Sequence, residues 1–208
     1  MGSYMMHLAV SNKVKKKLNL SDNFLYGSLL PDILKEEGQD RRINHYLKEE
    51  IINGNTKRLP DIPKVIKDLK KFENREIALG YLAHLIEDYI WFSVYIPSYV
   101  KEGNKECIYL KDNSIHSVQE FRKDIYEDYE RSNEYILNIM EEDLESLKNN
   151  LIKIADTLER KEWVKNRILV QKCTNMQENI LIAKESLDSY FKITTAEVEK
   201  VINKLIQK

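Results

Sequence analysis

The sequence contains little glycine, proline or cysteine, with six Gly, four Pro and two Cys in 208 residues. Because Gly and Pro are the residues that disfavour helices, their scarcity beside abundant Leu, Ile, Lys and Glu favours a mainly helical protein. Cys107 and Cys173 have neither the spacing of a metal motif nor that of a redox motif. We therefore expect both thiols to be reduced, and one or both to be buried.

The chain also lacks a dominant charge and a long apolar run. Its 33 Lys and Arg nearly balance its 34 Asp and Glu, for a net charge of -1. This balance argues against a dedicated nucleic-acid patch. No apolar run approaches the roughly 20 residues of a membrane span, and the N-terminus lacks the basic start and long apolar core of a signal peptide. We expect no transmembrane segment and a cytoplasmic location, while the oligomeric state stays open.

The length allows one sizeable domain, and we expect residues 1–208 to form a single all-α domain. A short buried helix is predicted from Phe24 to Leu30, because Pro31 disfavours the helical conformation of the residue before it. Ser117 and Glu120 form a capping box that starts a long helix. Further helices are expected near 65–72, 144–154, 163–169 and 195–205, the last capped by Thr194 or Thr195. The segment 99–113 is expected to be a loop, and no alternation is long enough to predict a sheet.

The most unusual segment runs from Ile77 to Trp91. No charged side chain occurs between Ile77 and Ile86, although 32% of the chain is charged. Apolar residues occupy nearly every face, so the predicted helix should be buried. His84 and Asp88 are four residues apart and share one side of it. Burying both costs several kcal/mol without compensation, which a metal cation would provide. The alternative is a core histidine with an aspartate hydrogen-bonded at a helix end.

Other potential metal ligands occur in the first ninety residues. His7, Asp32 and His45 each lie in or beside an apolar segment that should reach the core. With His84 and Asp88 they give three neutral imidazoles and two carboxylates, a ligand set suited to zinc or a similar divalent ion. Such a set can hold one ion, or two if a carboxylate bridges them.

Four ordered landmarks carry a family resemblance. They are MMHLA at 5–9, YGSLLPDI at 26–33, NHY at 44–46 and GYLAHLIEDYIW at 80–91. In these the sequence resembles the zinc-dependent phospholipase C family, whose superfamily also contains zinc-dependent single-strand nucleases. The resemblance covers roughly the first ninety residues. It implies an all-helical bundle with a metal cluster in a central cleft.

The resemblance also implies a site and an activity. Asp32, His45, His84 and Asp88 would hold one zinc ion, and Asp88 would bridge to a second ion bound by His7. The protein would be a metal-dependent phosphoesterase whose activated water attacks a small phosphoester or a phospholipid-like substrate. Asp32 is the candidate general base.

The sequence departs from the family pattern at the third zinc ion. That ion is held in the family by two further histidines and a glutamate, whereas His116 is the only histidine left in this chain. Asp124 and Asp128 are possible substitutes that would favour a third, harder divalent cation. The alternative function is a non-catalytic helical binding or regulatory protein that keeps the fold and a structural metal.

Overall fold

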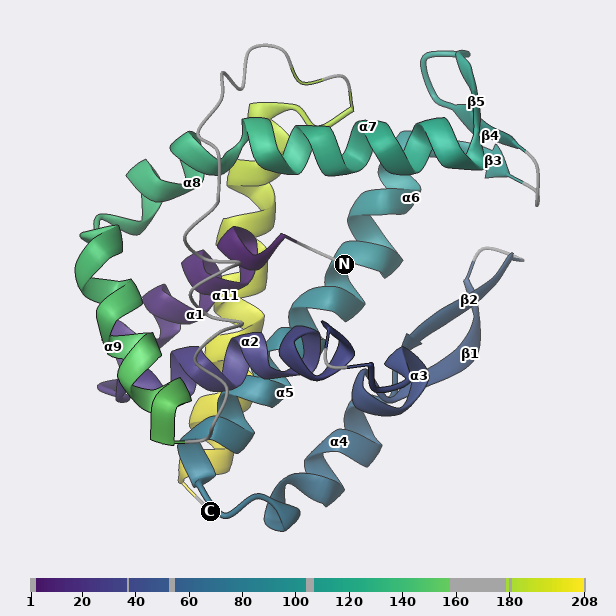
Figure 1. Cartoon of the computed structure of the whole chain (residues 1–208). Coiled ribbons are helices and arrows are strands. Elements are labelled where there is room, and N and C mark those ends of the chain that lie inside the picture. The colour runs from purple at the N-terminus through teal and green to yellow at the C-terminus, as the bar shows by residue number, and fades with distance from the viewer. Residues whose placement is uncertain are drawn as a thin grey trace.

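A computed structural model describes residues 3–36, 38–52, 55–103, 107–157, 179 and 181–207. Most of these residues are helical, which confirms the predicted all-α class (Figure 1). The helices are α1 (Tyr4–Leu18), α2 (Asp22–Glu36), α3 (Arg41–Asn44), α4 (Ile62–Asp68), α5 (Arg75–Ile90), α6 (Ile96–Tyr99), α7 (Val118–Arg131), α8 (Asn133–Met140), α9 (Leu144–Thr157) and α11 (Lys184–Ile206). A 3-10 turn, η1 (Leu69–Lys71), follows α4, and a π-helical turn, η2 (Trp91–Tyr95), joins α5 to α6.

Two small antiparallel sheets accompany the helices, so the expectation of no sheet was wrong. One is a hairpin of β1 (Leu47–Ile52) and β2 (Asn55–Pro60). The other has the order β3 (Val100–Gly103), β4 (Cys107–Leu110), β5 (Ile115–Ser117) and replaces much of the loop expected over 99–113. Strands of three to six residues are too short to display an alternating pattern, since backbone pairing with a neighbour defines them. Both sheets extend from the same side of the helical body (Figure 1).

The core lies among α1, α2, α5 and α11, and it is one continuous cluster of buried apolar side chains. Every residue of α5 from Ile77 to Asp88 is buried, as the uncharged stretch predicted. Asn74 begins this helix by accepting a hydrogen bond from the backbone N–H of Ile77 at 3.1 Å. In the described part of the chain, no helix is both long enough and apolar enough to cross a membrane. The assignment of residues 1–208 to one domain stays a prediction.

Helices α2 and α5 pack with their backbones in contact, and a glycine on each side permits this. A Cβ atom at Gly80 would overlap the carbonyl oxygen of Phe24 and lie 2.9 Å from the backbone nitrogen of Ser28. A Cβ at Gly27 would likewise overlap the carbonyl oxygen of Ile77. Both glycines are therefore required by close approach of two backbones rather than by an unusual φ angle.

Helix α2 continues through Pro31 to Glu36, so the predicted end near Leu30 was wrong. Proline has no N–H to bond the carbonyl of Gly27, which weakens the helix locally. However, Leu29 and Ile33 on either side of the proline are completely buried, and this packing outweighs the local preference. As a result, Asp32 lies in a helix inside the protein.

The C-terminal helices partly match the sequence expectations. The capping box of Ser117 and Glu120 is present and starts α7. Helix α11 begins at Lys184, so the expected start near residue 195 was wrong, and Thr194 and Thr195 are buried within it instead of capping it. Cys107 is half-buried. The helix expected near 163–169 and Cys173 fall outside the described residues.

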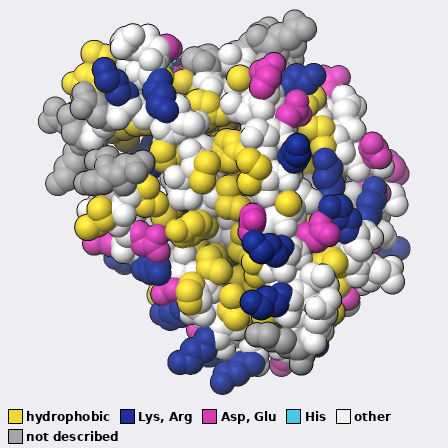
Figure 2. Space-filling view, turned by 180° about the vertical axis from the view of Figure 1, so that it is seen from behind, with side chains coloured by type: hydrophobic (Ala, Val, Ile, Leu, Met, Phe, Trp, Pro, Cys, Tyr) yellow, Lys and Arg dark blue, Asp and Glu magenta, His cyan; other side chains and the backbone are white. Residues whose placement is uncertain are grey.

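The surface carries charges of both signs, in keeping with the near-zero net charge. On the face seen in Figure 2, Lys and Arg side chains lie interspersed with Asp and Glu around a more apolar centre.

The glycine contact between α2 and α5 generates a stability prediction. Gly80→Ala would gain about 1 kcal/mol of helix propensity at an open position. Here we expect the variant to be about 3 kcal/mol less stable than the parent, because the new methyl group must separate two backbones. The measurement is the free energy of unfolding in urea. The control is Gly103→Ala, whose one overly close contact would be with the flexible end of the Ile108 side chain, and we expect its effect to stay within about 1 kcal/mol. A Gly80→Ala protein as stable as the parent would contradict the close-contact explanation.

Candidate metal centre

Five side chains that are distant in sequence meet between α1, α2, α3 and α5. His7 comes from α1, Asp32 from α2, His45 from the residue after α3, and His84 and Asp88 from α5. None of the five residues is more than 1% exposed. Their ligand atoms form two groups in which all atoms lie within 4.8 Å of one another: His7, Asp32 and His84, and His45, His84 and Asp88.

The distances resemble those around a shared cation. His45 Nε2 lies 3.4 Å from Asp32 Oδ1 and 3.9 Å from Asp88 Oδ2, which is also 3.9 Å from His84 Nε2. Two ligands of a tetrahedral zinc ion are about 3.3 Å apart at the usual bond lengths. The other Asp88 oxygen, Oδ1, lies 3.8 Å from His7 Nε2. Asp88 Oδ1 therefore faces His7, while Asp88 Oδ2 faces His45 and His84.

A hydrogen bond at Nδ1 orients each imidazole ring. His84 Nδ1 lies 2.7 Å from the carbonyl oxygen of Ser28, which can only accept, so this nitrogen carries the proton. His45 Nδ1 lies 2.7 Å from Asn44 Oδ1, and His7 Nδ1 lies 2.9 Å from Glu87 Oε2. Metal-binding histidines in proteins usually have such a partner, which directs the Nε2 lone pair toward the ion.

Several atoms that face the centre have no hydrogen bond in the described part of the chain. They are Nε2 of His7, His45 and His84, and both carboxylate oxygens of Asp32. Buried polar atoms are nearly always satisfied, because an unsatisfied one costs about 1–3 kcal/mol. Neutral imidazole nitrogens and carboxylate oxygens are ligand types that zinc prefers. The buried donor set therefore fits a divalent metal.

Burial also controls the protonation of the centre. It lowers the pKa of His7 to about 3, and the neighbouring His84 contributes in the same direction. Burial likewise lowers the pKa of His84. Both rings are thus neutral at pH 7, as a metal ligand must be. The two rings stack, with their centroids 3.8 Å apart.

Sequence reasoning missed Glu87, which is completely buried beside the predicted ligands. It accepts a hydrogen bond from Ser11 Oγ at 3.2 Å and contacts His7 as described above. Burial raises the pKa of the Glu87 carboxyl well above its usual range, so its ionised form needs a positive neighbour. A signal was present, since Glu87 and Asp88 are consecutive acids in a buried helix. Adjacent helical residues point about 100° apart, so the two acids serve different partners.

The sequence also gave no indication that Arg41 and Tyr81 lie at this centre. Arg41 Nη2 lies 3.8 Å from Asp88 Oδ2. The Tyr81 hydroxyl donates to the carbonyl oxygen of Asn44 and so ties the end of α3 to α5 next to His45. No pattern in the sequence identifies either residue, because both act across segments about 40 residues apart.

The third metal site at His116, Asp124 and Asp128 stays a prediction, and these residues have other contacts in the described part of the chain. His116 Nδ1 and Asp124 Oδ2 lie 2.9 Å apart and are partly exposed. Asp128 Oδ2 accepts hydrogen bonds from the backbone N–H groups of Leu181 and Ile182, at 2.6 and 2.8 Å. These hydrogen bonds join α7 to the segment before α11. Among the described residues, neither group of converging ligand atoms includes these three.

Comparison with known proteins identifies a family. The family model described as zinc dependent phospholipase C matches residues 6–169, well over half of the chain. The matched region includes all five converging side chains, whose buried His and Asp groups could hold the metal ions on which this family depends. Comparisons with curated proteins and with solved structures gave no match. The chain belongs to the zinc-dependent phospholipase C family.

Proposed function

We propose that the protein is a zinc-dependent phosphoesterase. In this proposal Asp32, His45, His84 and Asp88 would hold one zinc ion, and His7 together with Asp88 would hold a second. The substrate is a small phosphoester or a phospholipid-like molecule. The family match supports a zinc-dependent hydrolase of this general kind.

One observation carries the proposal. Three imidazole Nε2 atoms and the Asp32 carboxylate converge in a buried centre without hydrogen bonds to any described residue. A purely structural polar cluster would pair these atoms with each other or with the backbone. Here the backbone and the neighbouring side chains instead pair with the opposite nitrogen of each ring. This arrangement leaves one lone pair per histidine for a ligand.

The chain's own groups have distinct tasks in the reaction. When bound, zinc lowers the pKa of a water to about 7 and acts as a Lewis acid toward the phosphoryl group. Neither Asp32 oxygen accepts a hydrogen bond from a described residue, so one can serve as a ligand while the other accepts the proton of the attacking water. The carbonyl oxygen of Ser28, which can only accept, holds His84 in the tautomer that leaves Nε2 free, and ionised Glu87 would do the same for His7.

Space for a substrate lies next to the centre. A cavity of about 650 Å³ is lined in part by Arg41, the residue that contacts Asp88. The π-helical turn η2 follows directly on the helix of His84 and Asp88 and contributes Phe92 to the cavity wall. Such turns occur frequently at functional sites.

The first prediction from the proposed function concerns metal content. We expect purified protein to carry one to two zinc ions per chain by elemental analysis, and His84→Ala to lose at least one, because His84 belongs to both groups of ligand atoms. His116→Ala is the matched control, since His116 pairs with Asp124 and should not affect these ions. Parent protein without metal, or His84→Ala with unchanged zinc content and stability, would contradict the ligand assignment.

The second prediction concerns the orientation of His7. Glu87→Gln keeps the shape of the side chain but cannot carry the negative charge that, beside a bound cation, would support a proton on His7 Nδ1. We expect zinc affinity to fall about 10–100-fold, as for other residues that orient metal ligands. Competition with a chelator measures this, and Glu73→Gln, an exposed position just before α5, is the control. Equal affinities for the two variants would show that Glu87 does not support a ligand.

The third prediction concerns catalysis. Zinc-loaded protein should slowly hydrolyse bis(p-nitrophenyl) phosphate, lose this activity with a chelator and regain it with added zinc. Asp32→Asn should lower kcat by about 100-fold or more, because the amide keeps an oxygen ligand but cannot accept a proton. Its zinc content, measured in parallel, should change much less.

The alternative function makes the opposite prediction. If metal-replete protein hydrolyses nothing in a broad panel of phosphodiesters and phosphomonoesters, the enzyme proposal fails. The protein would then be a helical binding or regulatory protein with a structural metal.

A further inference from the structure

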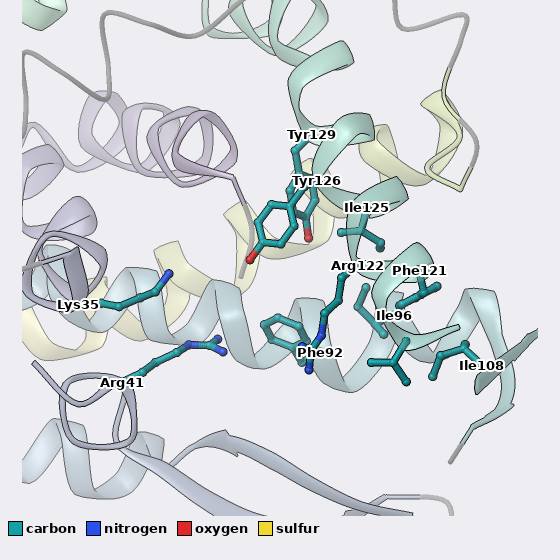
Figure 3. Close-up of a pocket in the computed structure, with 11 residues that line it drawn as sticks. Lys35, Arg41, Phe92, Ile96, Ile108, Phe121, Arg122, Ile125, Tyr126 and Tyr129 are labelled. Atoms are coloured by element: carbon teal, nitrogen blue, oxygen red, sulfur yellow. The ribbon is translucent and has the colours of Figure 1, made fainter. Parts of the chain in front are cut away.

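The cavity beside the metal centre has walls of two different kinds. Helices α2 and α3 contribute Lys35 and Arg41, while η2, α6, β4 and α7 provide the remaining walls. Figure 3 shows Lys35 and Arg41 reaching in from one side and Arg122 extending down from α7 beside Phe92 in the middle. Ile96, Ile108, Phe121 and Ile125 lie on the other side. The cavity is therefore cationic near the metal centre and apolar away from it.

The cationic side has no acidic residue among its described lining residues. Arg122 forms no ion pair with any residue in the described part of the chain, and it is exposed. Arg41 has a buried Nε atom that has no hydrogen-bond partner among the described residues, while its Nη2 atom faces Asp88. A buried donor without a partner is costly, and an anionic oxygen would satisfy it.

A smaller cavity of about 260 Å³ is also lined by arginine and apolar side chains. It shares Arg41 and Phe92 with the larger cavity and adds Arg42, Leu47 and Arg58. Arg42 and Arg58 are paired with Asp40 and Glu49, at 2.7 and 3.4 Å. Arg122 has no acidic partner among the described residues, and Arg41 is the lining residue that contacts the metal centre through Asp88.

The Phe92 ring does not offer an equivalent site for a cationic group. A quaternary ammonium group is usually bound over open aromatic faces. The guanidinium of Arg41 already lies over the Phe92 ring, 6.0 Å from its centroid. A second cation at this position would meet Arg41 and Arg122 as like charges.

We propose that this cavity selects phosphoesters that have a net negative charge and an apolar group, with Arg122 and Arg41 binding the anionic oxygens. This inference rests on the proposed function and specifies its substrate class. The apolar group lies along Ile96, Ile108, Phe121 and Ile125. Zwitterionic phosphoesters with a quaternary ammonium headgroup are disfavoured.

Arg122 offers a cleaner test than Arg41, because Arg41 contacts a proposed metal ligand. Arg122→Gln removes the charge from an exposed position on α7, and Lys123→Gln removes the same charge from its neighbour, which faces Glu127 and does not line the cavity. Calorimetry on zinc-loaded and on chelator-treated protein would use hexylphosphonate, methylphosphonate, inorganic phosphate and hexyltrimethylammonium. The phosphonates cannot be hydrolysed at the carbon–phosphorus bond, so binding is measured without turnover.

We expect hexylphosphonate to bind more tightly than methylphosphonate and inorganic phosphate, and hexyltrimethylammonium not to bind. Arg122→Gln should raise the Kd for hexylphosphonate about tenfold relative to Lys123→Gln, as for loss of one charge-assisted hydrogen bond. Equal Kd values for the two variants would overturn the inference. Equal Kd values for the hexyl and methyl compounds would overturn the apolar part of it, and free phosphate would then be the ligand.

A second arm separates this inference from the proposed function. Zinc-loaded protein is given short-chain phosphatidylglycerol and phosphatidylcholine at equal concentration, and we expect a preference for the anionic lipid that Arg122→Gln reduces about tenfold. Hydrolysis with a preference for phosphatidylcholine would leave the proposed function standing and overturn the inference. Absence of all hydrolysis, with Arg122-dependent binding of hexylphosphonate retained, would overturn the proposed function and leave the binding selectivity standing.

Discussion

Three imidazoles and two carboxylates are buried together in the interior of this protein, and the surrounding structure is arranged around that burial. Removing such groups from water is costly unless each acquires a partner. The protein supplies partners for the Nδ1 atoms through Ser28, Asn44 and Glu87. The Nε2 atoms are left facing the centre. Binding of a cation would therefore contribute directly to the stability of the fold, because the unfolded chain holds no such site.

The close contact of α2 with α5 brings these buried groups together. Ser28 and Asp32 lie on α2, and His84 and Asp88 lie on α5, so the distance between these helices sets the size of the centre. Gly27 and Gly80 let the two backbones touch. The glycines in the two longest family landmarks thus have a physical role. They bring the ligands of one helix within reach of the ligands of the other.

Arg41 connects the centre with the cavity. It faces Asp88 on one side and lines the cavity on the other, with Phe92 beneath its guanidinium. A cation in this position offsets part of the negative charge of the centre and provides an adjoining site for an anion. In the proposed function, the reacting phosphoryl group would lie between these two regions, with its apolar substituent directed along α6 and α7.

Residue types and family landmarks in four segments indicated the five side chains of the centre, whose role as metal ligands stays a prediction. The sequence by itself determined the helical class, the buried helix α5 and the capping box of α7. These depend on residue type and on spacing over a few residues, which a single segment contains. Only the tertiary structure decided that α2 continues through Pro31, that short strands pair at two places and that Glu87 orients His7. It also showed that Asp128 accepts hydrogen bonds from backbone N–H groups and that Arg122 lines the cavity. Each of these features depends on contacts between segments that are distant in the chain, where packing and pairing outweigh the local preference that a sequence pattern records.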